Sequence, residues 1–394
     1  MSPLGLHRSS LPDVSATSAP LPLADDAAWR ATVRLDRAQL ELKHGRELVL
    51  QPEDESAPLL LVAAVETLSA ERLATLDTWG HPLRLLLTGE RMQSLGGTAA
   101  PAALRCPPNV GLQTLQHWAA VSADVLDPQA LRDAAPTGPA MDAALRIAKR
   151  ARLTPALVAA ELPRSLAPRL AAAEILVLPV ADAERLLEAA TLRLQRVSDA
   201  RVPIAAREDC TLVLFREVGG GTEHVAVVFG TLDTQRPVPV RLHSSCLTGD
   251  LLGSLRCDCG DQLGRAVSQL AQCGGVLLYL SQEGRGTGLA NKLRAYRLQD
   301  GGLDTIDADR HLGFRDDERD YPAAVAMLQA LGITRIELLT NNPRKIAALQ
   351  AGGIEVAARV ALTAPTNVHN ARYVHTKRHR AGHLGSDNAP LDGQ

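Results

Sequence analysis

The chain has 394 residues, which is long enough for two or three domains with apolar cores of their own. It carries 42 basic and 44 acidic residues, a formal net charge of -2, which excludes a generic nucleic-acid binder because such a protein needs a concentrated basic face. Its apolar runs stay shorter than the roughly 20 residues of a membrane span, and residues 1–27 lack the apolar segment of a secretion signal. We therefore expect a cytoplasmic protein that binds neither nucleic acid nor a membrane.

The first part of the chain predicts an α/β domain. Residues 1–27 are rich in Ser, Pro and Ala without periodicity, which indicates a disordered leader. Downstream, helical and strand patterns alternate, and Gly96–Asn109 indicates a loop. The predicted strands are Glu47–Leu50, Leu59–Val65 and Leu83–Leu87, and the predicted helices are Arg34–His44, Ser69–Thr78 capped by Ser69, Pro139–Ala151, Thr154–Glu161 and Asp182–Leu194 capped by Asp182.

The pattern changes near Val197–Pro203, where we place the boundary between a first domain, residues 28–198, and a second, residues 199–384, with a flexible tail at 385–394. The predicted fold is mixed α/β (α+β), with two domains that each have a mixed sheet and packed helices. The predicted strands of the second domain are Thr211–Phe215, Glu223–Phe229, Val238–Leu242, Val276–Leu280, Arg335–Leu339 and Ile354–Val360, with a turn at Gly219–Gly221, and its helices are Asp261–Gln272, Leu289–Gln299, Pro322–Ala330 and Pro343–Gln350.

Cys246, Cys257 and Cys259 predict a metal site. On a strand, residues i and i+2 face the same side, so Cys257 and Cys259 can aim two thiolates at one point. Zinc favours thiolate ligands in tetrahedral geometry, and three protein ligands leave a fourth position for a water that the metal activates. The alternative is three unrelated buried thiols. Cys273, farther along, is expected to pack within a helix.

Gln282–Gly288 follows an apolar strand and precedes a helix. Its glycines let backbone N–H groups approach phosphate oxygens, and Arg285 adds a two-pronged donor. A plain Gly-rich turn is the alternative. A second segment of this kind is Thr340–Lys345, where helix capping explains Asn342 and Pro343 but leaves the hydroxyl and the ammonium at its two ends as phosphate contacts.

Asp316–Asp320 places Arg319 among carboxylates just before a predicted helix. Asp317 is a candidate general base, and a solvated acidic loop is the alternative. An open zinc site, two anion-binding segments and a base beside an arginine together indicate hydrolysis of a phosphorylated substrate.

None of the histidines is predicted to bind the metal. His375, His379 and His383 share one helix face, but they lie in a Lys/Arg-rich segment that we expect to be solvated. His224 lies in an apolar strand and is expected to be structural. His243 is expected to contact the substrate or to support Cys246 rather than to bind the metal.

From about Val202 to Leu384 the chain resembles the GTP cyclohydrolase II family, whose reaction begins riboflavin biosynthesis. The resemblance is carried by motifs that occur in the family's order: Arg241–Asp250, Gly253–Gly260, Gln282–Gly286, Asn291–Asp300, Leu312–Phe314, Asp317–Asp320 and Leu339–Pro343.

The resemblance implies a reaction and roles for matching residues. One zinc per chain, held by Cys246, Cys257 and Cys259, activates the water that attacks C8 of the guanine, so the ring opens and formate leaves. Tyr296 serves this ring-opening half and favours full turnover over a formamide product. Asp317 is the proton acceptor and Arg319 the nucleophile at the α-phosphate, where pyrophosphate leaves. The implied GTP contacts are Arg241, His243, Gln262, Glu283, Gly284, Arg285, Thr305, Thr340 and Lys345.

The resemblance also implies Mg²⁺ on the triphosphate, a homodimer, and 2,5-diamino-6-(5-phosphoribosylamino)pyrimidin-4-one as the product. Two positions depart from the family pattern: Ser245 replaces an acid before the first cysteine, and Thr287 replaces an aliphatic residue. Ser245 leaves open a paralogue with the same chemistry in another pathway. A nucleotide-binding regulatory protein without turnover is the other alternative.

Residues 28–198 resemble a degenerate 3,4-dihydroxy-2-butanone 4-phosphate synthase, the domain that often precedes this cyclohydrolase. That enzyme holds magnesium with an Arg-Glu-Asn-Glu-Gly-Asp loop and a later His-Thr-Glu. The corresponding stretches here, Pro52–Pro58 and Pro139–Asp142, lack the arginine, the glycine and the histidine, and Glu161 alone cannot assemble such a site. We therefore predict that this domain is catalytically inactive. Activity restored through Glu53, Asp54 and Glu55 is the alternative.

Overall fold

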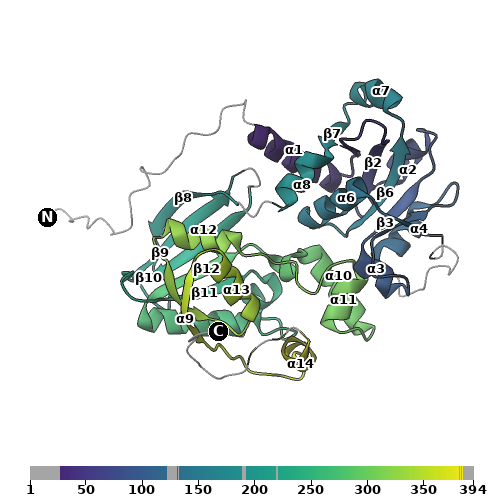
Figure 1. Ribbon diagram of the computed structural model, residues 1–394. Coiled ribbons are helices and arrows are strands. Elements are labelled where there is room, and N and C mark those ends of the chain that lie inside the picture. Colours follow the sequence, from purple (N-terminus) through teal and green to yellow (C-terminus); the bar gives the residue numbers. More distant parts are fainter. Residues whose placement is uncertain are drawn as a thin grey trace, which may run out of the picture. The chain divides into compact units, whose positions relative to one another are not determined.

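The computed structural model describes residues 27–121, 131, 133–188, 192–218, 221–380, 382 and 384. The predicted leader up to residue 26, the tail from 385, His383 and most of the Gly219–Gly221 turn lie outside the described residues. The chain divides into two compact units (Figure 1). We call Pro22–Ala190 with Gln282–Arg319 the N-terminal unit, and Thr191–Ser281 with Asp320–Gln394 the C-terminal unit.

The segment Gln282–Arg319, called the arm below, packs in the N-terminal unit although the residues before and after it belong to the C-terminal unit. Packing therefore divides the chain differently from the boundary at 198/199 that the sequence predicts. That boundary concerns sequence domains, and it stays a prediction.

The N-terminal unit contains a seven-stranded sheet in the order β5-β4-β3-β6-β2-β1-β7. Its neighbouring strands are antiparallel except β1 and β7, which run parallel. The strands are β1 Leu48–Gln51, β2 Leu59–Ala64, β3 Arg84–Leu87, β4 Ala102–Arg105, β5 Ala135–Pro136, β6 Ala156–Leu162 and β7 Leu176–Pro179.

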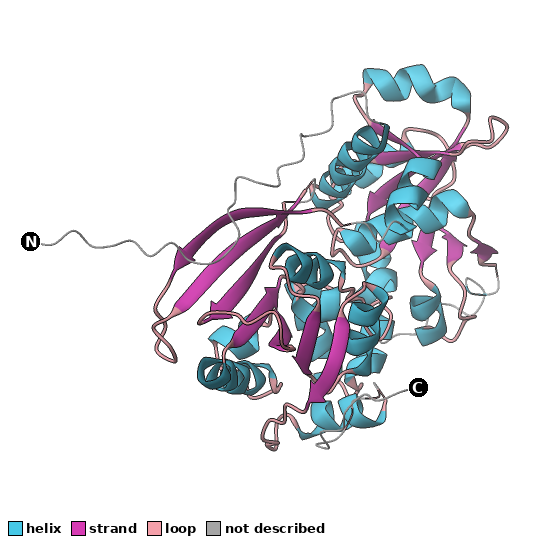
Figure 2. Cartoon of the chain, turned by 60° about the vertical axis from the view of Figure 1, so that its left-hand side comes forward, coloured by secondary structure: helices cyan, strands magenta, loops and turns pink. Residues whose placement is uncertain are grey.

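Helices cover both faces of this sheet, as the cyan and magenta elements of Figure 2 show. The helices are α1 Ala27–Lys43, α2 Ala70–Asp77, α3 Gly89–Ser94, α4 Leu112–Gln116, α6 Pro139–Arg150, α7 Ala167–Ala172 and α8 Val180–Glu188, together with α10 Leu289–Asp300 and α11 Thr305–His311 of the arm. Alternate residues of β2 enter two different apolar clusters: Leu59 and Leu61 lie in one, and Leu60 and Val62 lie in the other. The two faces of a strand alternate, so a sheet covered on both sides requires the continuous apolar run seen in β2.

The C-terminal unit contains a second seven-stranded sheet, in the order β14-β13-β11-β12-β10-β9-β8. Strands β14, β13, β11 and β12 are parallel, and β10, β9 and β8 continue the sheet antiparallel. The elements are β8 Leu194–Arg201, β9 Cys210–Glu217, β10 Glu223–Phe229, β11 Val238–Ser244, α9 Cys259–Cys273, β12 Gly275–Leu280, α12 Pro322–Ala330, β13 Arg335–Leu339, α13 Pro343–Ala351, β14 Glu355–Val360 and α14 Ala371–His379.

The mixed α/β class is thus confirmed, and many predicted elements hold. Helix α12 and strand β13 have the predicted bounds. The Ser69 hydroxyl accepts a hydrogen bond from the backbone of Arg72 at 3.2 Å, so Ser69 is the predicted cap of α2. Asn342 likewise caps α13, with Pro343 as its first residue.

Three predictions were wrong. The segment Thr154–Glu161 contains strand β6 instead of a helix, because its short apolar run pairs on both sides, with β2 and with β3. The predicted loop Gly96–Asn109 contains β4, which pairs with β3. Helix α8 begins at Val180, two residues before the predicted cap Asp182, and Leu194 already belongs to β8.

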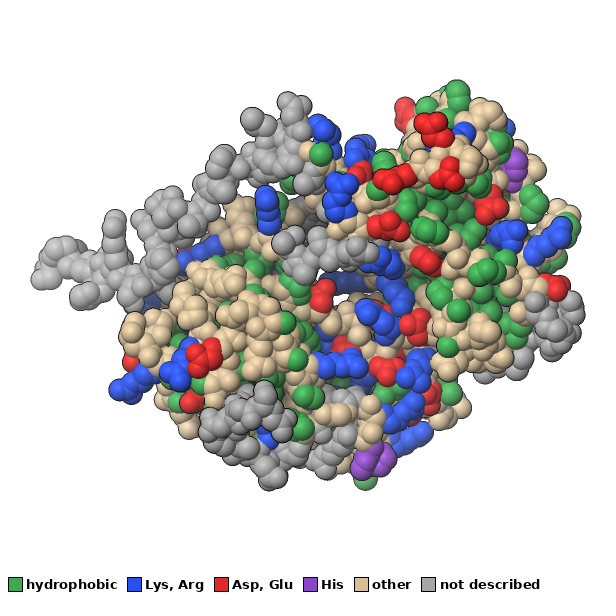
Figure 3. All heavy atoms as spheres, in the orientation of Figure 1, with side chains coloured by type: hydrophobic (Ala, Val, Ile, Leu, Met, Phe, Trp, Pro, Cys, Tyr) green, Lys and Arg blue, Asp and Glu red, His purple; other side chains and the backbone are tan. Residues whose placement is uncertain are grey.

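The surface agrees with the near-neutral composition. Figure 3 shows basic and acidic side chains interspersed on the face that it draws. Among the described helices, none has the length and hydropathy that crossing a membrane requires.

The arm's place in the N-terminal core can be tested with Phe314→Ala. Phe314 is fully buried in the cluster that also contains β3 and β6, so its truncation should destabilise the N-terminal unit by about 3 to 5 kcal/mol. Hydrogen exchange should then speed up at the amides of β3 and β6. The matched control is Phe229→Ala, because Phe229 is equally buried but lies in the C-terminal unit. This substitution should speed up hydrogen exchange in β9 and β10. Faster exchange in β9 and β10 after Phe314→Ala would contradict the assignment.

Candidate metal centre and active site

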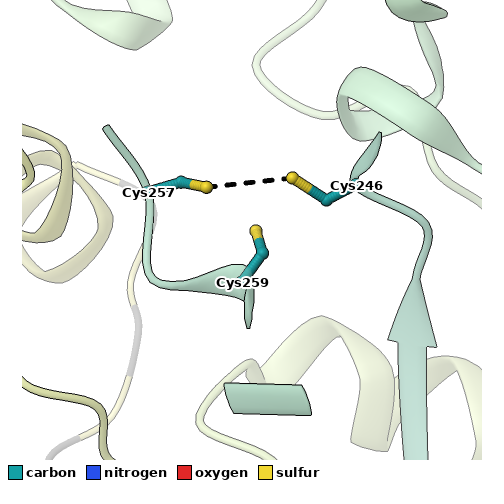
Figure 4. A group of neighbouring side chains, drawn as sticks. All are labelled: Cys246, Cys257 and Cys259. Atoms are coloured by element: carbon teal, nitrogen blue, oxygen red, sulfur yellow. Dashed lines mark hydrogen bonds between the residues drawn. The ribbon is translucent and has the colours of Figure 1, made fainter. Parts of the chain in front are cut away.

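Cys246, Cys257 and Cys259 come together in the C-terminal unit. Their sulfur atoms all lie within 4.8 Å of one another, and those of Cys246 and Cys257 are 3.8 Å apart. Figure 4 shows the three side chains turned toward one point. Among the described residues, this is the one group of three or more ligand side chains close enough to share a metal ion.

The route to this arrangement differs from the predicted strand. Cys246 follows β11 and caps a π-helical turn, Leu247–Leu251, accepting a hydrogen bond from the backbone N–H of Gly249 at 3.3 Å. Cys257 lies in the loop before α9, and Cys259 is the first residue of that helix. The two thiols therefore converge because the chain turns at Asp258 into a helix, and i, i+2 alternation plays no part.

The site fits a zinc ion. With Zn–S bonds of about 2.3 Å, tetrahedral geometry separates two sulfurs by about 3.8 Å, which is the Cys246–Cys257 distance. Gly249 permits this crowding, because a Cβ atom there would lie 2.9 Å from the sulfur of Cys257 and 3.0 Å from that of Cys246. A Cβ on Gly260 would meet the carbonyl oxygen of Gly249 at 2.4 Å, so both glycines are needed for close packing.

The close packing of the three thiols raises the pKa values of two of them. Hydrogen bonding with Cys246 raises the pKa of Cys257, with burial adding to the effect. Hydrogen bonding with Cys246 and Cys257, together with burial, raises the pKa of Cys259 well above its ordinary value. A bound divalent cation reverses this balance, because a coordinated thiol is deprotonated.

A buried polar network supports Cys246. One Asp250 oxygen accepts the backbone N–H of Cys246 and the Tyr279 hydroxyl, each at 2.9 Å, and the other lies 3.0 Å from Nε2 of His243. The His243 ring stacks on Tyr279 at 5.7 Å. Burial lowers the pKa of His243, and the hydrogen bond to Asp250 opposes that shift. His243 and the backbone of Cys246 thus share Asp250 as a hydrogen-bond partner.

A second network holds the turn between the other two cysteines. Lys377 of α14 donates to one Asp258 oxygen at 2.6 Å, and the Gln262 amide donates to the other at 2.7 Å. The Gln262 carbonyl in turn accepts from Arg241 at 2.8 Å. Lys377 also lies 4.4 Å from the Tyr373 ring centroid, and only 13% of its side chain is exposed. The prediction of a solvated basic segment is wrong for this lysine.

Thr340 and Lys345, predicted as phosphate contacts, lie at the end of β13 and in α13. Lys345 is buried and donates to the Leu242 carbonyl at 2.7 Å, while Arg241 donates to the Leu339 carbonyl at 2.8 Å. The fully buried Thr340 accepts the Asn342 N–H at 3.0 Å. These residues and Cys246 thus sit at the carboxyl ends of the parallel strands β11 and β13, which is where open α/β sheets bind ligands.

The glycine segment, Gln282–Gly288, belongs to the arm and therefore to the N-terminal unit. Gly284 and Arg285 have φ angles of 62° and 58°, so the chain is left-handed at two consecutive residues. Glu283 accepts from Lys292 at 2.8 Å. Thr287 is buried and closes the turn through a hydrogen bond to the Gly284 carbonyl at 2.7 Å, which accounts for a hydroxyl at this position.

The acidic segment, Asp316–Asp320, lies in the arm up to Arg319. Asp317 and Arg319 form a two-pronged pair, with nitrogen–oxygen distances of 2.9 and 2.7 Å. Burial acts to raise the pKa of Asp317, but the hydrogen bonds and charge of Arg319 outweigh it and leave that pKa below its ordinary value. Asp309, 3.5 Å from Arg285, is buried enough for its pKa to rise to about 7.

The arm holds the remaining predicted residues. Tyr296 lies on α10, with the Lys292 ammonium 5.8 Å from its ring centroid, and Thr305 is the first residue of α11. Within the arm, the structure joins the glycine segment to the acidic one, because Glu318 donates its N–H to the Arg285 carbonyl at 3.1 Å. The predicted residues of the C-terminal unit are Arg241, His243, Gln262, Thr340, Lys345 and the three cysteines.

Other predictions have mixed outcomes. His224 is buried between Glu217, at 3.0 Å, and the Ser281 N–H, at 3.1 Å, as a structural residue would be. His375 and His379 are exposed, and their ring centroids are 4.2 Å apart. Cys273 is exposed, so the packing prediction for it was wrong.

Sequence reasoning missed the supporting residues. Asp250 and Asp258 lie in the two motifs that contain the cysteines. Their positions, four residues after Cys246 and between Cys257 and Cys259, could have indicated that they support the metal ligands. For Lys377 and Asp309 the signal was absent, because only the fold buries them against their partners.

Comparison with known proteins gives consistent relatives. The family model described as GTP cyclohydrolase II matches residues 195–361. A GTP cyclohydrolase-2 of Azospirillum brasilense is 40% identical over 390 residues, covering 94% of this chain and 99% of the relative. A GTP cyclohydrolase-2 of Xylella fastidiosa (strain Temecula1 / ATCC 700964) is 43% identical over 357 residues, covering 90% of this chain and 87% of the relative.

A crystal structure of a two-domain 3,4-dihydroxy-2-butanone 4-phosphate synthase from A. baumannii covers 78% of this chain and 93% of its own, with 18% identity and a TM-score of 0.31. Similarity at this level is too low to assign the fold of the N-terminal region.

The role of Lys377 can be tested with Lys377→Met. Removing one partner of a buried ion pair leaves Asp258 charged and uncompensated, so the C-terminal unit should lose about 3 to 5 kcal/mol, measured by hydrogen exchange at the amides of α9. Arg372→Met, at an exposed position of the same helix, should change stability by less than about 0.5 kcal/mol. Equal effects of the two substitutions would show that the ion pair contributes nothing specific.

Proposed function

Because this chain belongs to the GTP cyclohydrolase II family, we propose that it hydrolyses GTP, opening the imidazole ring of the guanine with release of formate and pyrophosphate. The product is 2,5-diamino-6-(5-phosphoribosylamino)pyrimidin-4-one, and the pathway is riboflavin biosynthesis. Similarity over more than nine-tenths of the chain to a full-length relative of this name supports the proposal.

The observation that carries the proposal is the convergence of three cysteine sulfurs, two of them at the separation that tetrahedral zinc requires. We propose one zinc per chain on Cys246, Cys257 and Cys259. When bound there, zinc supplies Lewis-acid activation of water. The chain's own contribution is to hold the ligands: Asp250 fixes the backbone of Cys246, and Asp258 is held by two donors between the other two cysteines.

Arg241, Gln262, Thr340 and Lys345 are proposed GTP contacts, together with His243. The two cations lie at the carboxyl ends of neighbouring parallel strands, where an anionic substrate is favoured. Both donate to backbone carbonyls, which fixes their position, and a guanidinium and an ammonium have further N–H donors for substrate oxygens.

Asp317 and Arg319 are proposed to release pyrophosphate. A guanidinium nitrogen of Arg319 attacks the α-phosphorus as Asp317 accepts its proton, and the bond to pyrophosphate breaks as the N–P bond forms. Water then cleaves the N–P bond, which leaves the phosphate on the product, and Asp317 returns the proton to Arg319. The two-pronged pair orients the nucleophile, and the lowered pKa of Asp317 keeps this carboxylate ionised near neutral pH. Glu283, Gly284, Arg285 and Thr305 are proposed further contacts, with Tyr296 serving ring opening.

Three further proposals come from the resemblance alone: Mg²⁺ on the triphosphate, a homodimer, and a first domain without synthase activity. A divalent site of that synthase type would need several carboxylates. Glu161, the one that the sequence retains, lies exposed on β6.

Incubation of the purified protein with GTP and Mg²⁺ tests the function. Formate, pyrophosphate and a pyrimidine absorbance should appear together, and zinc analysis should give about one ion per chain. Cys257→Ser should abolish formate release and lower the zinc content, because it removes one of three ligands. Cys273→Ser, an exposed cysteine of the same unit, is the matched control and should leave both unchanged. GTP binding without formate would favour the regulatory alternative, and a formamide product would contradict the role given to Tyr296.

Ribulose 5-phosphate tests the first domain. We expect no conversion by the wild-type protein in the presence of Mg²⁺, because the arginine, the glycine and the histidine of the synthase motifs are missing. Proton NMR of the mixture would detect the butanone phosphate. Its accumulation at a rate that scales with protein concentration would show that the domain is active.

A further inference from the structure

We propose that the N-terminal polypeptide, Pro22–Ala190, is the scaffold that positions the arm, and that Lys149 is a positioning residue for the Asp317–Arg319 pair. This inference rests on the proposed function, because it takes that pair to act on the substrate. It gives the first domain a role that needs no catalysis of its own.

The arm completes an apolar core that the N-terminal strands begin. Phe314 is fully buried in a cluster that also contains residues of β2, β3, β4 and β6. Ala295 of α10, Ala308 of α11 and Leu312 are buried in the same cluster. Burying one large apolar side chain contributes about 1.5 to 3 kcal/mol, so these contacts are sufficient to order the arm.

Polar side chains of α3 and its cap hold the backbone where α11 ends. The Thr88 hydroxyl donates to the Gly313 carbonyl at 2.9 Å. Arg91, 1% exposed, donates to the His311 carbonyl at 2.9 Å and to the Trp118 carbonyl at 3.0 Å. A Cβ on Gly313, whose φ is 86°, would lie 2.9 Å from the Thr88 hydroxyl. An arginine this deeply buried costs free energy unless its donors are satisfied, and a carbonyl of the arm satisfies one of them.

The start of α10, just after the glycine segment, is held in a similar way. Asn291 is fully buried, pairs with the Thr154 hydroxyl at 3.1 Å and donates to the Arg152 carbonyl at 3.1 Å. One turn later, Arg294 forms an ion pair with Glu66 at 3.0 Å. The helix that carries Tyr296 is thus bound to N-terminal residues through buried side chains.

Lys149 of α6 reaches the acidic segment itself. It donates to Glu318 at 2.8 Å, and the side chains are 18% and 9% exposed. Glu318 stands between Asp317 and Arg319 in the chain, and its N–H binds the Arg285 carbonyl. Fixing Glu318 at its side chain and its backbone therefore restricts the two residues on either side of it.

The main experiment compares Lys149→Met with Lys149→Arg and with Arg150→Met, an exposed neighbour on the same helix. In Lys149→Met, kcat for pyrophosphate release from GTP should fall by about tenfold or more, while KM and zinc content stay near wild type, because a displaced reactive pair slows the chemical step. Arginine should restore most of the rate, and Arg150→Met should change little. Unchanged kcat in Lys149→Met, or an equal loss in Arg150→Met, would overturn the role of Lys149.

A double-mutant cycle tests whether Lys149 acts through Glu318. Glu318→Gln alone should lower kcat at least as much as Lys149→Met, because it also removes the ion pair with Arg315. Adding Lys149→Met to it should cost less than a further twofold, because the Lys149–Glu318 pair is already lost. Additive losses would overturn this route.

Thr88→Val tests the scaffold without reference to activity. The substitution keeps the shape and removes the hydrogen bond to Gly313, so amide exchange should speed up in residues 305–319 and not in the C-terminal unit. Unchanged exchange there, in this variant and in Lys149→Met, would overturn the scaffold. If the wild-type protein releases no formate from GTP, the proposed function fails, and the exchange experiment still decides whether the arm is held.

Discussion

The crowding of three thiol groups beyond the carboxyl end of β11 is the constraint on which the rest of the C-terminal unit depends. Sulfur atoms this close are compatible only with a shared cation or with raised pKa values, and here burial and mutual hydrogen bonding raise the pKa of Cys257 and Cys259. A Cβ on Gly249 would lie 2.9 Å from the sulfur of Cys257 and 3.0 Å from that of Cys246, and a Cβ on Gly260 would meet the carbonyl oxygen of Gly249 at 2.4 Å. The local backbone is therefore shaped to the size of one ion, and this is the reason to describe the cysteines as a centre rather than as three core residues.

Buried charges in both units are arranged in pairs and chains. Lys377 faces Asp258, Arg319 faces Asp317, and Lys149 faces Glu318. An unpaired charge at such depth costs several kcal/mol, so each partner holds the other in a defined position. In the C-terminal unit the chain of contacts runs from α14 to the cysteine turn and on to Arg241. In the arm, the Asp317–Arg319 pair lies next in sequence to the Glu318 that Lys149 binds. Residues outside the recognised motifs are thereby structural parts of the site.

The arm packs in the N-terminal unit although the residues on either side of it in the sequence belong to the C-terminal unit. It carries family motifs, yet its apolar residues belong to the core built by β2, β3, β4 and β6. Removal of the first domain would leave Phe314 and Leu312 without that core. The proposed absence of synthase activity is compatible with retention of the first domain, because packing and catalysis are separate requirements.

Sequence alone determined the mixed α/β class and most elements with strong periodicity, because hydrophobic periodicity and helix caps are local properties of the chain. It misjudged β6 and β4, since a short apolar run pairs as a strand only when partners exist on both sides. It also identified the cysteines while misplacing Cys257 and Cys259 on a strand. Tertiary structure decided what buries Lys377 and Asp309, and which core receives Phe314. These outcomes depend on contacts between residues more than a hundred positions apart, or on the burial that such contacts produce, and the free energy of those contacts is not encoded in any local pattern.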